Sequence, residues 1–175
     1  MGGFIAAQFA ATHPEMVASV WLIDAAGTVA GSNSEIVKHY KVTGQIPLLV
    51  ARESDFPAML DAAMYKKPFL PYSFRATLAR RAVADFSLHR QILTQFIGES
   101  PVLEAQFSTI DAPALIVWGM EDRILNPAGA EELRGLFPNS ELRLMPGIGH
   151  LPMMEAPEIV ARDYLTFRSR ALVHL

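Results

Sequence analysis

An aspartate and a histidine each follow a short apolar run, and together they could carry acid–base chemistry. Asp122 lies in a turn after residues 114–118, and His150 follows the glycines of Gly147-Ile148-Gly149 after residues 141–145. An imidazole oriented by a carboxylate can take a proton from a nucleophile and return it to a leaving group. We therefore predict that Asp122 and His150 form the acid–base half of a nucleophilic catalytic site.

The elements around these residues alternate between strand and helix. Residues 114–118 and 141–145 read as strands, and residues 128–137 and 157–170 read as helices, with Pro157 suited to the first helical turn. Strands joined by helical crossovers form a parallel sheet, whose carboxyl ends share one edge. Asp122 and His150 are therefore expected within hydrogen-bonding reach of each other.

The first hundred residues contain an α/β segment followed by a helical one. Residues 2–12 have helical spacing and end at His13-Pro14, and residues 17–23 read as a buried strand ending at Asp24. From residue 31 to about 109, proline-punctuated helical patterns dominate without a convincing strand, with helices expected at 34–43, 55–65, 73–86 and 88–97. We predict two parts of one α/β core, residues 1–30 and 110–175, and an inserted all-helical cap, residues 31–109.

Two motifs resemble those of the α/β-hydrolase family. They are Trp118-Gly119-x-x-Asp122-Arg123-Ile124-Leu125 and Gly149-His150-Leu151-Pro152-Met153-x-Glu155-x-Pro157. In that family the first motif supplies the catalytic acid after strand seven and the second supplies the histidine after strand eight. The resemblance implies an α/β fold that is the C-terminal part of such a hydrolase, with strands six to eight.

The start of the chain resembles the second half of the family's nucleophile elbow. The segment Met1-Gly2-Gly3-Phe4 corresponds to the residues after the nucleophile in Gly-x-Ser-Met-Gly-Gly. The resemblance implies that the nucleophile lies just before Met1 and that the backbone N–H of Met1 lines the oxyanion hole. We therefore expect the 175-residue chain alone to be inactive.

Among hydrolases of this fold, the chain looks most like monoacylglycerol-lipase-like carboxylesterases. The marks are Ala25-Ala26-Gly27, Pro68-Phe69-Leu70-Pro71 and Ile124-Leu125-Asn126-Pro127. The resemblance implies a serine hydrolase acting on a small lipophilic ester without a cofactor. Carbon–carbon bond hydrolases share the Ser-Met-Gly-Gly pattern and stay open as the alternative chemistry.

Apolar side chains of the cap and of the histidine loop are candidates for substrate binding. They are Met59, Phe69, Leu70 and Met153, since flexible methionines and aromatic rings suit acyl chains. Any one of them could equally be a core residue.

Other carboxylates and histidines compete with the predicted pair. Glu121 fits a solvated loop charge, and Asp24 fits a turn-capping residue, although some hydrolases of this fold place the catalytic acid there. His13, His39, His89 and His174 have no carboxylates at metal-ligand spacing. No metal site is expected.

Composition excludes several classes of protein. The chain is 51% hydrophobic and 19% charged with a net charge of -3, and its basic residues are scattered, so nucleic acid is not an expected partner. Without cysteine there is no disulfide or thiol nucleophile. No apolar run is long enough for a membrane span, and the start does not read as a signal peptide, which favours a cytoplasmic location.

A second hypothesis is that the chain is a truncated, non-catalytic product. Three strands of a larger sheet would leave an apolar edge where strand five belongs, and such edges pair with other strands. We therefore expect the fragment to self-associate or to pair with its N-terminal half.

Overall fold

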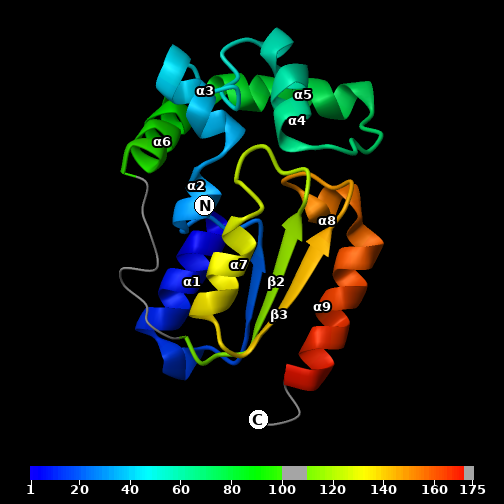
Figure 1. Cartoon of the computed structure of the whole chain (residues 1–175). Helices are drawn as coiled ribbons and strands as arrows, with labels where there is room; N and C mark the ends of the chain where they lie inside the picture. The colour runs from blue at the N-terminus through cyan, green and yellow to red at the C-terminus, as the bar shows by residue number, and fades with distance from the viewer. Residues whose placement is uncertain (100–109, 172–175) are drawn as a thin grey trace.

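Three parallel strands form the centre of the molecule. The computed structural model describes residues 1–99 and 110–171 (Figure 1). Strands β1 (Val20–Ile23), β2 (Ala114–Gly119) and β3 (Ser140–Met145) pair in that order, with Ile23 opposite Val117 and Gly119 opposite Met145. The predicted α/β class and its three parallel strands are confirmed. The first strand is shorter than expected, because Pro14–Met16 forms a 3-10 turn (η1) and pairing begins only at Val20.

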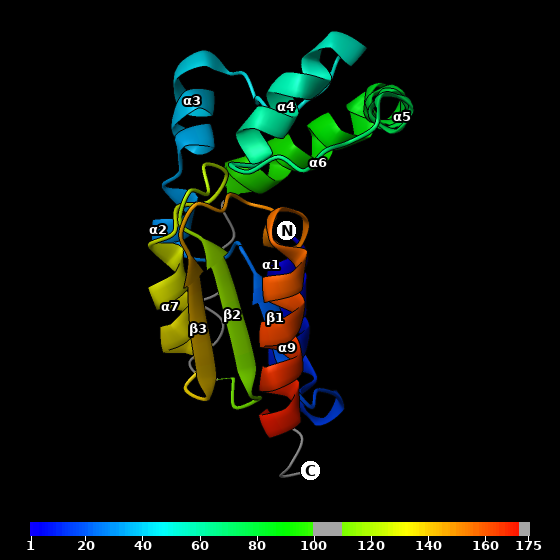
Figure 2. The same cartoon turned by 90° about the vertical axis from the view of Figure 1, so that its right-hand side faces the viewer.

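Helices cover both faces of this sheet. Helices α1 (Gly2–Thr12) and α7 (Gly129–Leu136) pack on one face and α9 (Pro157–Ala171) on the other. Figure 2 shows α7 and α9 on opposite sides of the sheet. Along β2, Ile116 and Trp118 contact the first pair of helices, whereas Leu115 and Val117 contact α9. Because β2 is the middle strand, every one of its residues is buried, and its apolar run has no alternation.

A close contact between α1 and the end of β1 explains one glycine of the elbow-like motif. A Cβ on Gly3 would overlap the Cβ of Ala25, which follows β1. The helix therefore packs directly against the end of the strand, and only glycine leaves room for this contact.

A layer of helices lies above the carboxyl ends of the strands (Figure 1). It contains α3 (Glu35–Thr43), α4 (Phe56–Ala63), α5 (Tyr72–Ala84) and α6 (Phe86–Glu99), which match the four predicted helices within a few residues. Its small apolar core is built on Val50, Phe56 and Ala79. The short helices α2 (Val29–Ser32), α8 (Pro152–Glu155) and η2 (Glu53–Asp55) were not predicted, since one helical turn leaves little periodic signal. The predicted cap boundary at 109 and His174 lie outside the described residues.

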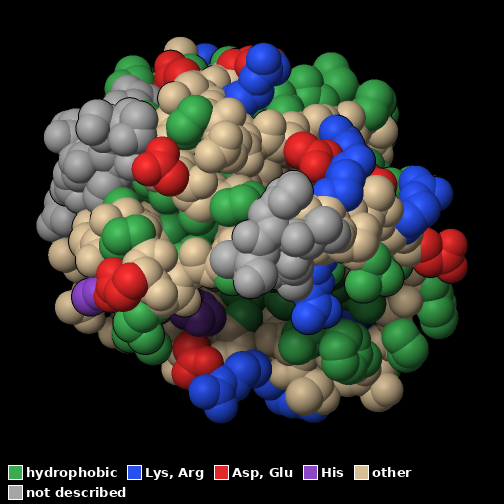
Figure 3. Space-filling model, turned by 90° about the horizontal axis from the view of Figure 1, so that it is seen from below, with side chains coloured by type: hydrophobic (Ala, Val, Ile, Leu, Met, Phe, Trp, Pro, Cys, Tyr) green, Lys and Arg blue, Asp and Glu red, His purple; other side chains and the backbone are tan. Residues whose placement is uncertain are grey.

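The face opposite the cap is mixed in charge. In Figure 3, acidic and basic side chains of the described residues are interspersed on this face. Arg143 and Arg170 each pair with Glu141, at 2.9 and 2.6 Å. Within residues 1–99 and 110–171, none of the helices combines the length and the apolar character needed to cross a membrane.

Candidate active site

Asp122 lies in the turn that follows β2, and its side chain is fully surrounded. Oδ1 accepts hydrogen bonds from the backbone N–H groups of Ile124 at 2.8 Å and Leu125 at 3.1 Å. Its Oδ2 lies 2.7 Å from Nδ1 of His150, and its side chain has no exposed surface. These donors stabilise a charged carboxylate and fix its plane, so Asp122 can orient an imidazole.

His150 follows β3 and faces Asp122 as the sequence predicted. Its backbone N–H donates to the carbonyl of Ala63 at the end of α4, at 2.9 Å, which ties the loop to the cap. With Nδ1 hydrogen-bonded to Asp122, the tautomer that donates from Nδ1 leaves Nε2 as the free base. One fifth of the His150 side chain is exposed. The ring can therefore exchange a proton with a group that lies beside Nε2.

Glycines bring the two loops close enough for this contact. A Cβ on Gly119 would overlap the carbonyl oxygen of Gly149, so the end of β2 and the histidine loop touch through their backbones. The N–H of Glu121 also donates to the carbonyl of Ile148 at 2.9 Å. The Glu121 side chain is exposed and accepts weakly from Gly147 N–H at 3.3 Å, so it lies apart from the imidazole.

Glu155 holds the histidine loop, a role that was not predicted. This buried carboxylate accepts from the N–H groups of Gly149 at 3.0 Å and Leu151 at 3.3 Å, and from Tyr65 at 2.9 Å and Lys66 at 2.6 Å. It thus joins residues on both sides of His150 to the segment after α4. The sequence contains a feature that could have indicated this role, because Glu155 is the single carboxylate in the otherwise mostly apolar stretch 148–156.

Asp24, the alternative acid, lies at the end of β1 beside the pair. Its Oδ1 accepts from the N–H of Gly119 at 2.8 Å, while its Oδ2 is buried without a hydrogen-bond donor among the described residues. Burial, and then the neighbouring charges of Asp122 and Glu155, outweigh the Gly119 hydrogen bond and raise its pKa to about 9. His150 is hydrogen-bonded to Asp122, and the interpretation of Asp24 as a turn residue agrees with its φ of 42°.

Asp24, Asp122 and His150 also form the one cluster of possible metal ligands in the described residues, with one atom of each within 4.8 Å of the others. Two of these three side chains are joined by the 2.7 Å hydrogen bond between Asp122 Oδ2 and His150 Nδ1. The arrangement suits proton transfer.

A cavity of about 350 Å³ lies beside His150. Met1, at the start of α1, and Met59, from α4, line it together with His150. Among the described lining residues only Ser32 and His150 carry hydrogen-bonding side chains. The structure therefore joins the predicted histidine, the predicted oxyanion position and one predicted substrate residue around a mostly apolar space.

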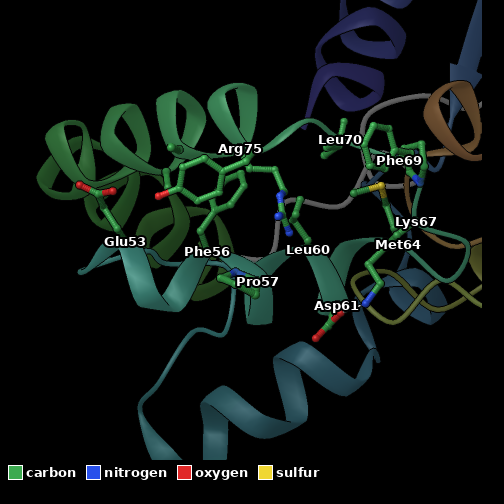
Figure 4. Close-up of a pocket in the computed structure, with 14 residues that line it drawn as sticks. Glu53, Phe56, Pro57, Leu60, Asp61, Met64, Lys67, Phe69, Leu70 and Arg75 are labelled. Atoms are coloured by element: carbon green, nitrogen blue, oxygen red, sulfur yellow. Dashed lines mark hydrogen bonds and ion pairs between the residues drawn. The ribbon is translucent and has the colours of Figure 1, made fainter.

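The other predicted substrate residues lie elsewhere. Phe69 and Leu70 line a second cavity of about 660 Å³ in the cap, with Phe56 and Leu60 of α4 and Arg75 of α5 (Figure 4). Met59 faces the His150 cavity from the same helix, so α4 separates the two spaces. Met153 lies on α8, 41% exposed, and lines neither cavity.

Known proteins resemble this chain along nearly its whole length. Residues 1–157 match the alpha/beta hydrolase fold family. Lipase 3 of Moraxella sp. (strain TA144) is 32% identical, with 96% of this chain and 53% of the lipase covered, and rat monoacylglycerol lipase ABHD6 is 26% identical, with 95% and 52% covered. The crystal structure of a membrane phospholipase A, described as a bacterial virulence factor, superposes with a TM-score of 0.90 at 37% identity, covering 97% of this chain and 54% of that one.

The chain thus spans about half the length of the curated relatives it matches. The family match, the parallel sheet and the Asp122–His150 pair all agree. The chain belongs to the α/β-hydrolase fold family.

Proposed function

We propose that the protein carrying this chain is a serine hydrolase that cleaves carboxylic esters of lipophilic acids. The observation that carries the proposal is the 2.7 Å hydrogen bond between Asp122 and His150 at the wall of an apolar cavity. The lipase relatives agree with this chemistry.

In the proposed mechanism, His150 is the general base and then the general acid. Its Nε2 takes the proton of a serine hydroxyl as that oxygen attacks the ester carbonyl, and it returns the proton to the departing alcohol. A water then attacks the acyl-serine with the same assistance. Asp122 holds the ring through Nδ1 and stabilises the imidazolium that forms in each half-reaction.

The serine and one oxyanion donor are assigned from the family resemblance. We place the serine just before Met1 and the donor at the backbone N–H of Met1, whose position beside His150 in the cavity supports this. Peptide N–H groups aimed at the developing oxyanion stabilise the tetrahedral intermediate. On this assignment the 175 residues alone lack the attacking group and do not turn over ester.

The character of the cavity favours ester cleavage over carbon–carbon bond cleavage. A carbon–carbon bond hydrolase must stabilise a carbanion as an enolate, which needs polar donors around the substrate. The described lining residues are apolar except for Ser32 and His150, and apolar walls suit an acyl chain. We infer that Met59 contacts the acyl chain of the substrate. Phe69, Leu70 and Met153 would act from outside the cavity.

We also propose that the free edge of β1 pairs with the other half of the hydrolase sheet. In the described residues β1 pairs with β2 alone, and apolar residues of α1 such as Ile5 and Phe9 are exposed, at 60% and 43%. A preceding half of the length seen in the relatives would cover both. In its absence the chain is expected to self-associate, which sedimentation at several concentrations would detect.

The function is tested with a fluorophosphonate probe and a panel of p-nitrophenyl esters of increasing acyl length. We expect labelling and turnover by the protein extended upstream of Met1, and neither by residues 1–175 alone. Replacing His150 by Ala should abolish turnover in the extended protein. Labelling and turnover by residues 1–175 alone would refute the assignment of the nucleophile, and an extended protein that labels but cleaves none of the esters would refute the substrate class.

A further inference from the structure

Asp24 poses a hydrogen-bonding problem that ester cleavage does not explain. One of its oxygens accepts from Gly119 N–H, and the other is buried with no donor in the described residues. Asp24 lies at the end of β1, and its backbone has a left-handed φ of 42°, a conformation that packing must hold in place. An ionised oxygen buried without a donor is strongly unfavourable.

The charged groups around Asp24 make ionisation harder still. Asp122 and Glu155 are both acidic, and His150 completes the group with one atom of Asp24, Asp122 and His150 within 4.8 Å of one another. After burial, these two carboxylates are the causes that raise the pKa of Asp24 to about 9. At neutral pH its carboxyl group therefore keeps a proton.

The neighbouring Asp122 has room to accept that proton in a hydrogen bond. A carboxylate offers about four lone-pair positions. Two on Oδ1 are used by Ile124 and Leu125, and one on Oδ2 is used by His150. One position on Oδ2 is left, on the same oxygen that orients the imidazole.

We propose that Asp24 is a positioning residue that donates a hydrogen bond from its protonated carboxyl group to Asp122, so that a carboxylic acid, a carboxylate and an imidazole form one chain across the ends of the three strands. The neutral acid holds Asp122 against His150 without placing a second negative charge beside it. The kinetic role rests on the proposed function, while the charge state of Asp24 does not.

The charge state is tested by the pH dependence of stability in Asp24→Asn, whose amide can both accept from Gly119 and donate to Asp122. Below the ordinary pKa of 3.8, Asp24 is neutral in folded and unfolded chains alike. Above it the unfolded chain loses a proton that the folded chain keeps, so the wild type loses stability relative to the variant by about tenfold in the folding equilibrium per pH unit. This loss continues until pH about 9.

Asp111 is exposed, so Asp111→Asn serves as a surface control. Chemical denaturation of wild type, D24N and D111N at several pH values between 4 and 9 measures this effect. We expect the free energy of unfolding of D24N to increase relative to that of the wild type as pH rises. The curve for D111N should run parallel to the wild-type curve. Parallel curves for D24N and wild type would overturn the proposal, because an Asp24 that is ionised when folded shows no such difference.

The positioning role is tested by ester hydrolysis in the complete protein, comparing D24N with the non-donating D24L. We expect D24N to keep kcat within about threefold, and D24L to lose about tenfold in kcat with KM unchanged, which is the rate equivalent of one hydrogen bond. Equal rates in the two variants would overturn this role. If D24L fails to fold, D24N is compared with Asp24→Ala instead, and an equal loss of kcat in these two variants would overturn this role. Failure of the proposed function can be distinguished from failure of this role. In that case the wild type would not hydrolyse the ester, while the pH dependence of its stability could still be measured.

Discussion

Asp122 and Asp24 follow two neighbouring strands, yet their carboxyl groups have different hydrogen-bond partners. Both are buried, at 6% and 3% exposure. Asp122 faces three donors, whereas Asp24 has one and an oxygen without any among the described residues. Similar burial therefore leaves the two carboxyl groups with different numbers of hydrogen-bond donors. Burial and the charges of Asp122 and Glu155 raise the pKa of Asp24.

Glu155 follows the pattern of Asp122. It is as buried as Asp122, at 6% exposure, and four backbone N–H groups donate to it. The contrast therefore extends from two residues to three, with the donor-rich carboxylates placed where they hold His150 or its loop.

The largest expected effect breaks the Asp122–His150 unit itself. In the complete protein, His150→Ala should lower kcat for ester hydrolysis by about 10⁵-fold or more, because it removes the general base. Adding Asp122→Asn to that variant should change little, since an orienting carboxylate has no effect without the imidazole. Additive losses in the double variant, measured by steady-state kinetics, would mean that the two residues act separately.

A smaller loss is expected when the donor-rich Glu155 is made neutral. Glu155→Gln keeps the shape but gives up charge-assisted hydrogen bonds and turns an N–H₂ group toward backbone donors, so it should reduce the free energy of unfolding by about 2–3 kcal/mol. The exposed Glu158 on α9 supplies the control, Glu158→Gln, with an effect within about 0.5 kcal/mol. Denaturant melts compare them. Similar midpoints for both variants would contradict the role given to Glu155.

Gly119 lies between Asp24 and the histidine loop, since its N–H donates to Asp24 and a Cβ on it would overlap the backbone of Gly149. Gly119→Ala should destabilise the fold by about 1–3 kcal/mol through overpacking and lower activity by moving His150. Gly135 on α7 has nothing within 4 Å of an added Cβ, so Gly135→Ala should instead stabilise by about 0.5–1 kcal/mol. Thermal melts that order the two variants the other way would refute the close contact.

Much of the fold could be predicted because its signals are local. The apolar run at β2, the proline at the start of α9 and the glycines before His150 place strands, helices and the histidine without any long-range information. The Asp122–His150 contact followed from strand ends meeting at one edge.

What could not be predicted depends on packing between distant segments. The raised pKa of Asp24 follows from its burial and from the charges of Asp122 and Glu155, which lie about a hundred residues away or more. The clamp by Glu155 depends on the cap segment after α4 lying beside the histidine loop. Phe69 and Leu70 resemble Met59 in their apolar chemistry, and only the placement of α4 separates their cavities.

We expect Asp122, and not Asp24, to be the acid that serves His150. The decisive measurement is kcat for a p-nitrophenyl ester in the complete protein, with Asp122→Asn and Asp24→Asn side by side. D122N should lose about 10⁴-fold, as expected when the acid of a catalytic triad is neutralised, and D24N no more than about threefold. Comparable losses, or a larger loss in D24N, would contradict it.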